Sequence, residues 1–239
     1  MIVDFATFCY SGDVHRLHKP GQLEKQVLSN DYPFRQVIVV YQNLAPPDWL
    51  ECTYPVLQVT INDIDKVLLA YDIDLDEHQY QSPTDNHHTW KVHVVNHLEA
   101  VRHSPSDYIV FADLDCWMIS QPDSWVQRGI EALESDPTIF IVSPNDGESE
   151  RRTQVMSQQM FLVKTEDFRN ADFNQPGYSG NPRDYSEMPE YHAMLEGRMH
   201  YYCQAMGRYR YVLPSEYRYW HHNRTTADDQ LETDLSKWH

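Results

Sequence analysis

The sequence predicts an α/β fold in one domain, with a mostly parallel central sheet. Short apolar segments alternate with segments in which apolar residues recur at helical spacing. Turn-forming residues, such as those at 29–33, separate the two kinds of segment. An alternation of this kind favours a sheet whose two faces are covered by helices. The length of 239 residues is enough to bury a sizeable core in one such domain.

The elements follow one another in a regular order. Strands are expected at residues 2–10, 37–41, 56–61, 108–112 and 138–142. Helices are expected around 23–28, within 86–102 and around 126–133, where apolar residues repeat with a period near 3.6. Ligands of such sheets bind beyond the carboxyl ends of the strands. A functional site is therefore expected after Tyr10, Tyr41, Ile61 and Ala112.

Composition excludes several classes of protein. The chain carries 36 Asp and Glu against 19 Lys and Arg, a net charge of −17, which disfavours non-specific binding of nucleic acid. A hydrophobic content of 41% is too high for a disordered chain. No apolar run approaches the ~20 residues of a membrane helix, and no secretory signal is visible at the start. We therefore expect a cytoplasmic protein without a membrane span.

The four cysteines give little information about function. Cys9, Cys52, Cys116 and Cys203 lie far apart and form no Cys-x-x-Cys pair. This spacing suits neither a zinc site nor a disulfide framework, so buried thiols are the simplest interpretation.

The most informative segment is residues 107–115, Asp-Tyr-Ile-Val-Phe-Ala-Asp-Leu-Asp. Five strand residues lead directly into Asp113 and Asp115. Side chains two apart on an extended chain point the same way, so the two carboxylates are expected to converge. Because neighbouring carboxylates repel each other, a divalent cation with oxygen ligands, Mn²⁺ or Mg²⁺, would stabilise them. A second Asp-x-Asp at residues 72–76 lacks the preceding strand and the pattern of a calcium loop.

Two classes of enzyme place Asp-x-Asp at the end of a strand. Haloacid-dehalogenase-type phosphatases usually have Thr or Val where Trp117 stands, and their motif typically follows the first strand. The sequence instead resembles nucleotide-sugar glycosyltransferases of the GT-A fold, family 2-like, over most of its length. The resemblance lies in the 107–115 strand, the helix-then-strand stretch from Lys91 through Asn96 that precedes it, and the more variable half that follows. Many relatives carry an Asp where the second strand ends in Tyr41-Gln42-Asn43.

The resemblance implies a domain at residues 1–224 followed by an acidic tail at 225–239. The nucleotide-binding half would span 1–115 and the smaller acceptor half 116–224. The implied reaction moves a sugar from a nucleotide-sugar donor, expected to be UDP-linked, to the hydroxyl of a carbohydrate or another acceptor.

The resemblance also implies a ligand set for the cation. Asp115 would be the main ligand, with Asp113 contacting ribose or completing the metal shell. A late histidine often completes this shell, and His221 and His222 both qualify, with His222 preferred. Arg224 would then face the donor diphosphate.

Further donor contacts are expected around the same edge of the sheet. Thr7 and Tyr10 lie at the end of the first strand, where an aromatic ring could stack on the base. Asp63 follows the third strand and is a candidate for base or ribose, and Lys91 could reach the diphosphate. In the resemblance, Gln158 or Gln159 could bond the hydroxyls of the donor sugar.

An inverting enzyme needs a carboxylate that takes the proton of the acceptor hydroxyl. The stretch from Glu196 to Pro214 resembles the family segment that carries this base, which makes Glu196 the first candidate and Glu190 the second. A retaining enzyme would need neither. Residues 174–188 read as a long loop of the kind that closes over substrate.

Two alternatives remain open. Residues 198–224 interleave arginines with aromatic residues, which would suit stacked bases and phosphates as well as sugars. One alternative is therefore a phage-type glycosyltransferase that acts on hydroxylated bases in DNA. The other is a nucleotide- or sugar-binding module without catalysis.

Overall fold

The structure is a computed structural model. It describes residues 1–9, 20–42, 44–48, 50–70, 87–145, 151–173 and 195–221, and for residues 65, 87–93 and 221 the backbone alone.

An eight-stranded sheet forms the centre of the molecule, in the order β3-β2-β1-β4-β8-β6-β9-β7. Its strands are β1 (Val3–Cys9), β2 (Val37–Gln42), β3 (Val56–Ile61), β4 (Tyr108–Ala112), β6 (Ile139–Ser143), β7 (Arg151–Thr153), β8 (Met160–Lys164) and β9 (Tyr209–Val212). The first four strands in the chain are parallel, and so are β6 and β9. Only β8, between β4 and β6, and β7 at the edge run antiparallel to their neighbours. The predicted α/β fold with a largely parallel sheet is confirmed.

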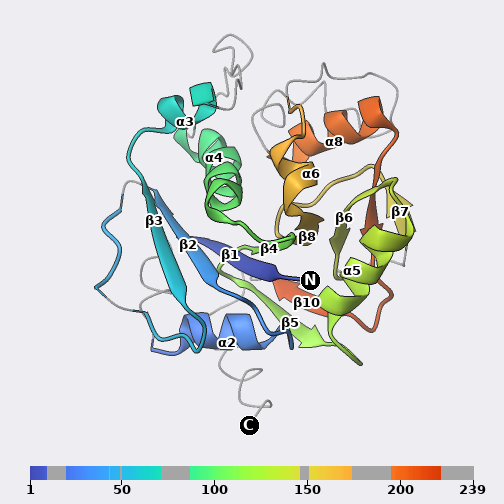
Figure 1. Cartoon of the computed structure of the whole chain (residues 1–239), viewed down its shortest axis with the longest axis horizontal. Coiled ribbons are helices and arrows are strands. Elements are labelled where there is room, and N and C mark those ends of the chain that lie inside the picture. Colours follow the sequence, from blue (N-terminus) through green and yellow to red (C-terminus); the bar gives the residue numbers. More distant parts are fainter. Residues whose placement is uncertain are drawn as a thin grey trace.

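Helices cover both faces of this sheet, as Figure 1 shows. The helices α3 (Ile64–Ala70), α4 (His87–His103), α6 (Thr165–Arg169) and α8 (Leu195–Met206) lie on one face, and α2 (Gln22–Leu28) and α5 (Trp125–Ser135) on the other. The apolar face that the sequence predicted for α4, at Val94, Val95, Leu98 and Val101, is buried in the core. Apolar residues of alternate strand positions therefore enter two separate cores, one on each face. None of the helices in the described part of the chain is long and apolar enough to cross a membrane.

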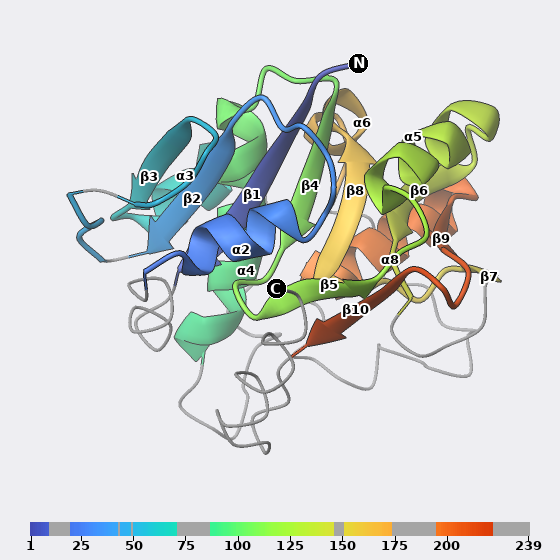
Figure 2. The same cartoon turned by 90° about the horizontal axis from the view of Figure 1, so that it is seen from below.

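A second, two-stranded sheet was not predicted from the sequence. It pairs β5 (Cys116–Ser120), which begins directly after the Asp-x-Asp motif, with β10 (Arg218–His221) in antiparallel register. In this register His221, the last described residue of the chain, lies opposite Cys116. Cys116 directly follows Asp115, so the end of β10 lies beside the Asp-x-Asp motif. Figure 2 shows β5 and β10 running together below the main sheet, with α2 beside β5.

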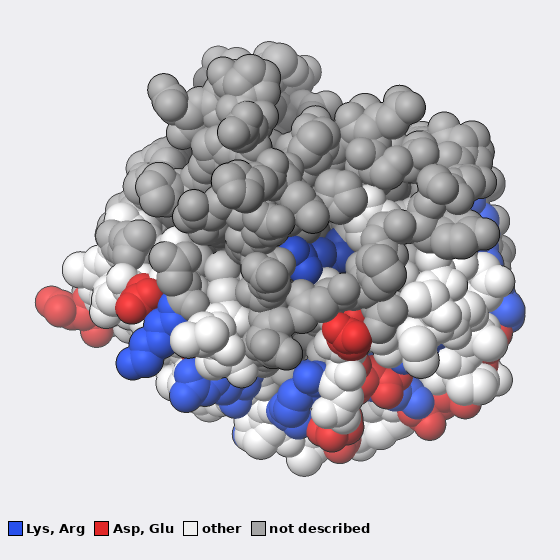
Figure 3. All heavy atoms as spheres, turned by 90° about the horizontal axis from the view of Figure 1, so that it is seen from above, with Lys and Arg blue, Asp and Glu red and all other residues white. Residues whose placement is uncertain are grey.

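Charged side chains of both signs share the surface. Blue and red side chains lie next to each other along the lower rim of the face in Figure 3. Some charged side chains of the described residues form close ion pairs, among them Arg208 with Asp167 and Arg169 with Glu166, both at 2.7 Å. The described part of this face is therefore not uniformly basic, as a phosphate-binding surface would be.

Candidate metal and donor site

The carboxylates of Asp113 and Asp115 lie on a tight turn at the carboxyl end of β4. The N–H of Cys116 donates to the carbonyl oxygen of Asp113 at 2.9 Å, which closes the turn over Leu114 and Asp115. The expectation that an extended chain brings the two carboxylates together is therefore wrong in its geometry. The turn produces the convergence instead, and it leaves both side chains half-buried while Leu114 anchors it in the core.

Asp113, Asp115 and Cys116 together form a potential metal-binding group. One ligand atom from each residue lies within 4.8 Å of the other two. The Cys116 thiol is fully buried, and burial, reinforced by the charges of the two aspartates, raises its pKa well above the ordinary value. The two carboxylates suit a hard cation such as Mg²⁺ or Mn²⁺, whereas sulfur is a softer ligand. The group therefore fits a hard cation, which its two carboxylates could hold.

The chain just before β8 joins this turn to a third acidic residue, Glu196. The N–H of Asp113 donates to the carbonyl oxygen of Gln159 at 2.7 Å, and the Tyr219 hydroxyl donates to Oε1 of Gln159 at 2.8 Å. The neighbouring N–H, that of Gln158, donates to Oε1 of Glu196 at 3.0 Å. Segments from four parts of the chain therefore meet at the carboxyl end of β4.

Glu196 lies in the first turn of α8 and is only partly exposed. Burial raises the pKa of its carboxyl, and the Gln158 N–H and the positive charge of Arg210 offset this only in part. A carboxylate with a raised pKa is a stronger base than an exposed one. Of the two predicted candidates for the base, Glu196 is linked to the turn of Asp113 and Asp115 through the backbone of Gln158 and Gln159, whereas Glu190 lies outside the described residues.

The structure places four other predicted residues in different surroundings. Thr7 is fully buried in the middle of β1, and its hydroxyl has no hydrogen-bond partner among the described residues. Asp63 is exposed and its Oδ1 accepts the N–H of Lys66 at 3.0 Å, which caps the start of α3. The backbone of Lys91 belongs to α4. The side chain of Gln158 is almost fully buried, and its Oε1 lacks a partner within the described ranges.

Several predictions cannot be placed. Tyr10, His222 and Arg224 lie outside the described residues, as do the second Asp-x-Asp at 72–76, the loop at 174–188 and the tail at 225–239. The roles predicted for them stay predictions.

Three arginines of the aromatic-rich stretch 198–221 bond inside the protein. Arg198 donates to the carbonyl oxygen of Phe173 at 2.7 Å, and Arg210 donates to the Ser143 hydroxyl at 2.8 Å. Arg208 pairs with Asp167 at 2.7 Å and lies over the ring of Phe140. These guanidinium groups hold strands and helices together, which leaves them unsuited to bind a phosphate backbone.

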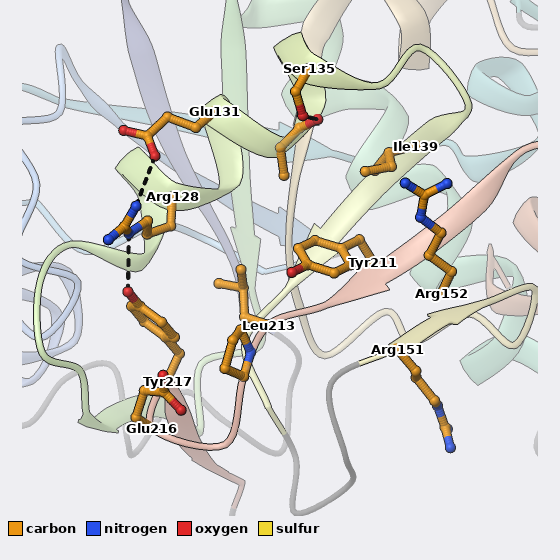
Figure 4. A pocket seen from close by; sticks show the side chains of 12 residues that line it. Arg128, Glu131, Ser135, Ile139, Arg151, Arg152, Tyr211, Leu213, Glu216 and Tyr217 are labelled. Carbon is orange, nitrogen blue, oxygen red and sulfur yellow. Dashed lines mark hydrogen bonds and ion pairs between the residues drawn. The ribbon is translucent and has the colours of Figure 1, made fainter.

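A cavity of about 790 Å³ lies beside α5 and β9, and none of the predicted site residues lines it. Arg128 and Tyr217 meet at its wall, where the guanidinium Nε donates to the tyrosine oxygen at 3.2 Å (Figure 4). Arg152, which also lines the cavity, bonds Asp136 at 2.5 Å. Arg128 and Arg152 therefore already have protein partners. The cavity is separate from the turn at residues 113–116, called the aspartate turn below.

The comparisons with known proteins concern structure alone. No protein-family model and no curated protein matches the sequence. TarS residues 1–349 from S. aureus are similar in structure, with a TM-score of 0.45 and 11% identity over 92% of this chain. This chain spans 60% of that one. A197 from STIV is similar with a TM-score of 0.43 and 11% identity over 93% of this chain and 86% of its own.

Proposed function

We propose that this chain is a metal-dependent glycosyltransferase that moves a sugar from a nucleotide-sugar donor to an acceptor hydroxyl. The observation that carries the proposal is that the backbone of Gln158 and Gln159 links an aspartate pair to a partly buried glutamate at the carboxyl end of β4. Asp113 and Asp115 are half-buried on one turn, and Glu196 is joined to the same place through Gln158. A ligand is expected at this end of a parallel sheet.

The roles of the residues follow from charge and position. Asp115 and Asp113 would hold Mn²⁺ or Mg²⁺ through oxygen atoms. The cation, when bound, supplies positive charge against the negative charge that grows on the departing nucleoside diphosphate. Glu196 would take the proton of the acceptor hydroxyl, because its raised pKa brings it closer to neutral pH. Gln158 would hold Glu196 in place through its backbone and offer its side-chain amide to the sugar.

The remaining donor contacts are proposed from the resemblance. Thr7, Tyr10, Asp63 and Lys91 would contact nucleotide or diphosphate, with UDP as the expected nucleotide. His222 would complete the metal shell and Arg224 would face the diphosphate. The pairing of β10 supports the role of His222 in the metal shell, because the preceding residue, His221, pairs with Cys116 beside the aspartate turn. Residues 1–115 would form the nucleotide-binding half, 116–224 the acceptor half and 225–239 an acidic tail.

The test is the release of sugar from a panel of nucleotide sugars, measured with and without Mn²⁺ in the absence of acceptor. Glycosyltransferases of this kind are expected to hydrolyse their own donor slowly, so free sugar should form from one donor and only with metal. Binding of UDP and Mn²⁺ without cleavage of any donor would favour the non-catalytic module instead. Activity on modified DNA that falls steeply with added salt would favour the DNA acceptor.

A further inference from the structure

Gln26 is a buried glutamine of α2 that touches the aspartate turn from below. Its side chain has no exposure to solvent. Its Nε2 donates to the carbonyl oxygen of Asp113 at 2.7 Å and to that of Cys116 at 3.1 Å. Since both partners are carbonyl oxygens, only the amide NH₂ can face them, which fixes the orientation of the side chain.

These two carbonyls are the first and last of the turn. The carbonyl of Asp113 also accepts the Cys116 N–H, so the closing bond of the turn and the Gln26 amide share one acceptor. The distance between the two ends is thereby set by one rigid, planar group. Asp115 lies between these ends, so its backbone position depends on the same group.

The helix that carries Gln26 is itself fixed to the chain that follows the turn. The Ser29 hydroxyl accepts the N–H of Met118 at 3.3 Å, and its carbonyl accepts Nε2 of Gln121 at 2.9 Å. Asn30 accepts the indole N–H of Trp125 at 2.9 Å in the core. Gln26 therefore acts from a support that cannot easily move relative to β5, beside which α2 lies in Figure 2.

We propose that Gln26 is the positioning residue of the metal site: it holds the Asp113–Cys116 turn in the shape that binds the cation. This inference rests on the proposed function. Asp113 and Asp115 repel each other when no cation lies between them, so the turn tends to open. Two hydrogen bonds from one buried amide oppose this, because they hold the backbone at both ends of the turn that carries the two carboxylates. Groups that orient metal ligands in this way typically contribute 10–100-fold to metal affinity.

The test compares two glutamine-to-methionine variants in a calorimetric titration with Mn²⁺. Gln26→Met keeps the length of the side chain but removes both donors, and we expect the dissociation constant for Mn²⁺ to rise about 10-fold or more. Gln121→Met is the matched control. It also removes an amide that ties α2 to the following chain, but this amide does not touch the turn. We expect it to lower the melting temperature and leave Mn²⁺ affinity unchanged.

The outcomes separate the two proposals. Wild-type protein without Mn²⁺ affinity would overturn the proposed function, and this inference with it. Wild-type protein that binds Mn²⁺, together with an unchanged Gln26→Met affinity, would overturn this inference alone. Equal loss of affinity in both variants would also overturn it, because the effect would then be one of general stability. If Gln26→Met does not fold, Gln26→Asn keeps the amide one methylene short of the two carbonyls and is expected to lose affinity in the same way.

Discussion

The backbone N–H of Gln158 donates a hydrogen bond of 3.0 Å to the carboxylate of Glu196. The next residue, Gln159, accepts the N–H of Asp113 at 2.7 Å. Two consecutive backbone positions therefore connect the proposed base with the proposed metal ligands. The backbone before β8 therefore links the turn of Asp113 and Asp115 to the side-chain carboxylate of Glu196.

Glu196→Gln is expected to reduce turnover and spare donor binding. The amide oxygen can still accept the Gln158 N–H, but the amide cannot take a proton from the acceptor. Loss of general base catalysis typically costs 10²–10⁴-fold in rate. Steady-state rates and calorimetric binding of UDP with Mn²⁺ would measure the two effects, with the exposed Glu216→Gln as control. Weakened donor binding would show that Glu196 is not the base.

The same substitution is expected to stabilise the fold near neutral pH. Burial raises the pKa of Glu196 in the folded protein above its ordinary value of 4.5. The stability that the protonated carboxyl contributes is therefore present below pH 4.5, and it is lost as the pH rises through the pKa of the folded state. A neutral glutamine has no such loss. Urea unfolding of both proteins should therefore agree at acidic pH, and the advantage of Glu196→Gln should grow toward pH 7. If Glu196→Gln were more stable than the wild type by the same amount at every pH, the raised pKa of Glu196 would be contradicted.

Cys116→Ser is expected to leave Mn²⁺ affinity unchanged within about threefold. The cation prefers carboxylate oxygens, and the thiol is held neutral by burial. The small loss in stability that results from a hydroxyl in an apolar position is separable by thermal unfolding. A large fall in Mn²⁺ affinity would make Cys116 a third ligand and the site softer than proposed.

Gly129→Ala is expected to destabilise the fold without changing the metal site. A Cβ at this position of α5 would lie 2.7 Å from Cδ2 of Leu162, which is itself fully buried. Overpacking of this kind lowers the free energy of unfolding by about 1–3 kcal/mol. The better helix propensity of alanine offsets about 1 kcal/mol of this loss. Urea unfolding should show a net loss, with Mn²⁺ affinity unchanged. Unaltered stability would mean that α5 packs less tightly on β8 than the structure has it.

Strong local patterns explain what could be predicted from the sequence. The buried strand 108–112 is a continuous apolar run, and its end at Asp113 marks the edge where ligands bind. The apolar face of α4 is equally clear at a period of 3.6. The strand–helix alternation and the position of the acid pair are local features, which is why both could be predicted.

Long-range pairing explains what could not be predicted. β5 was missed because its five residues follow the motif directly, and its partner β10 lies about a hundred residues further along. The link from Glu196 to Gln158 joins positions 38 residues apart. Gln26 offered no signal at all, since a lone glutamine in a short helix reads as a surface residue until its 87-residue reach to Asp113 is known.

The cation at the aspartate turn is tested most directly by calorimetric titration of Mn²⁺ in the presence of UDP. The proteins to compare are the wild type, Asp115→Ala and Asp72→Ala, the last from the second Asp-x-Asp of the sequence. Binding by the wild type and by Asp72→Ala, with none detected for a folded Asp115→Ala, is the predicted result. Equal binding by all three proteins would place the cation elsewhere and contradict the proposed function.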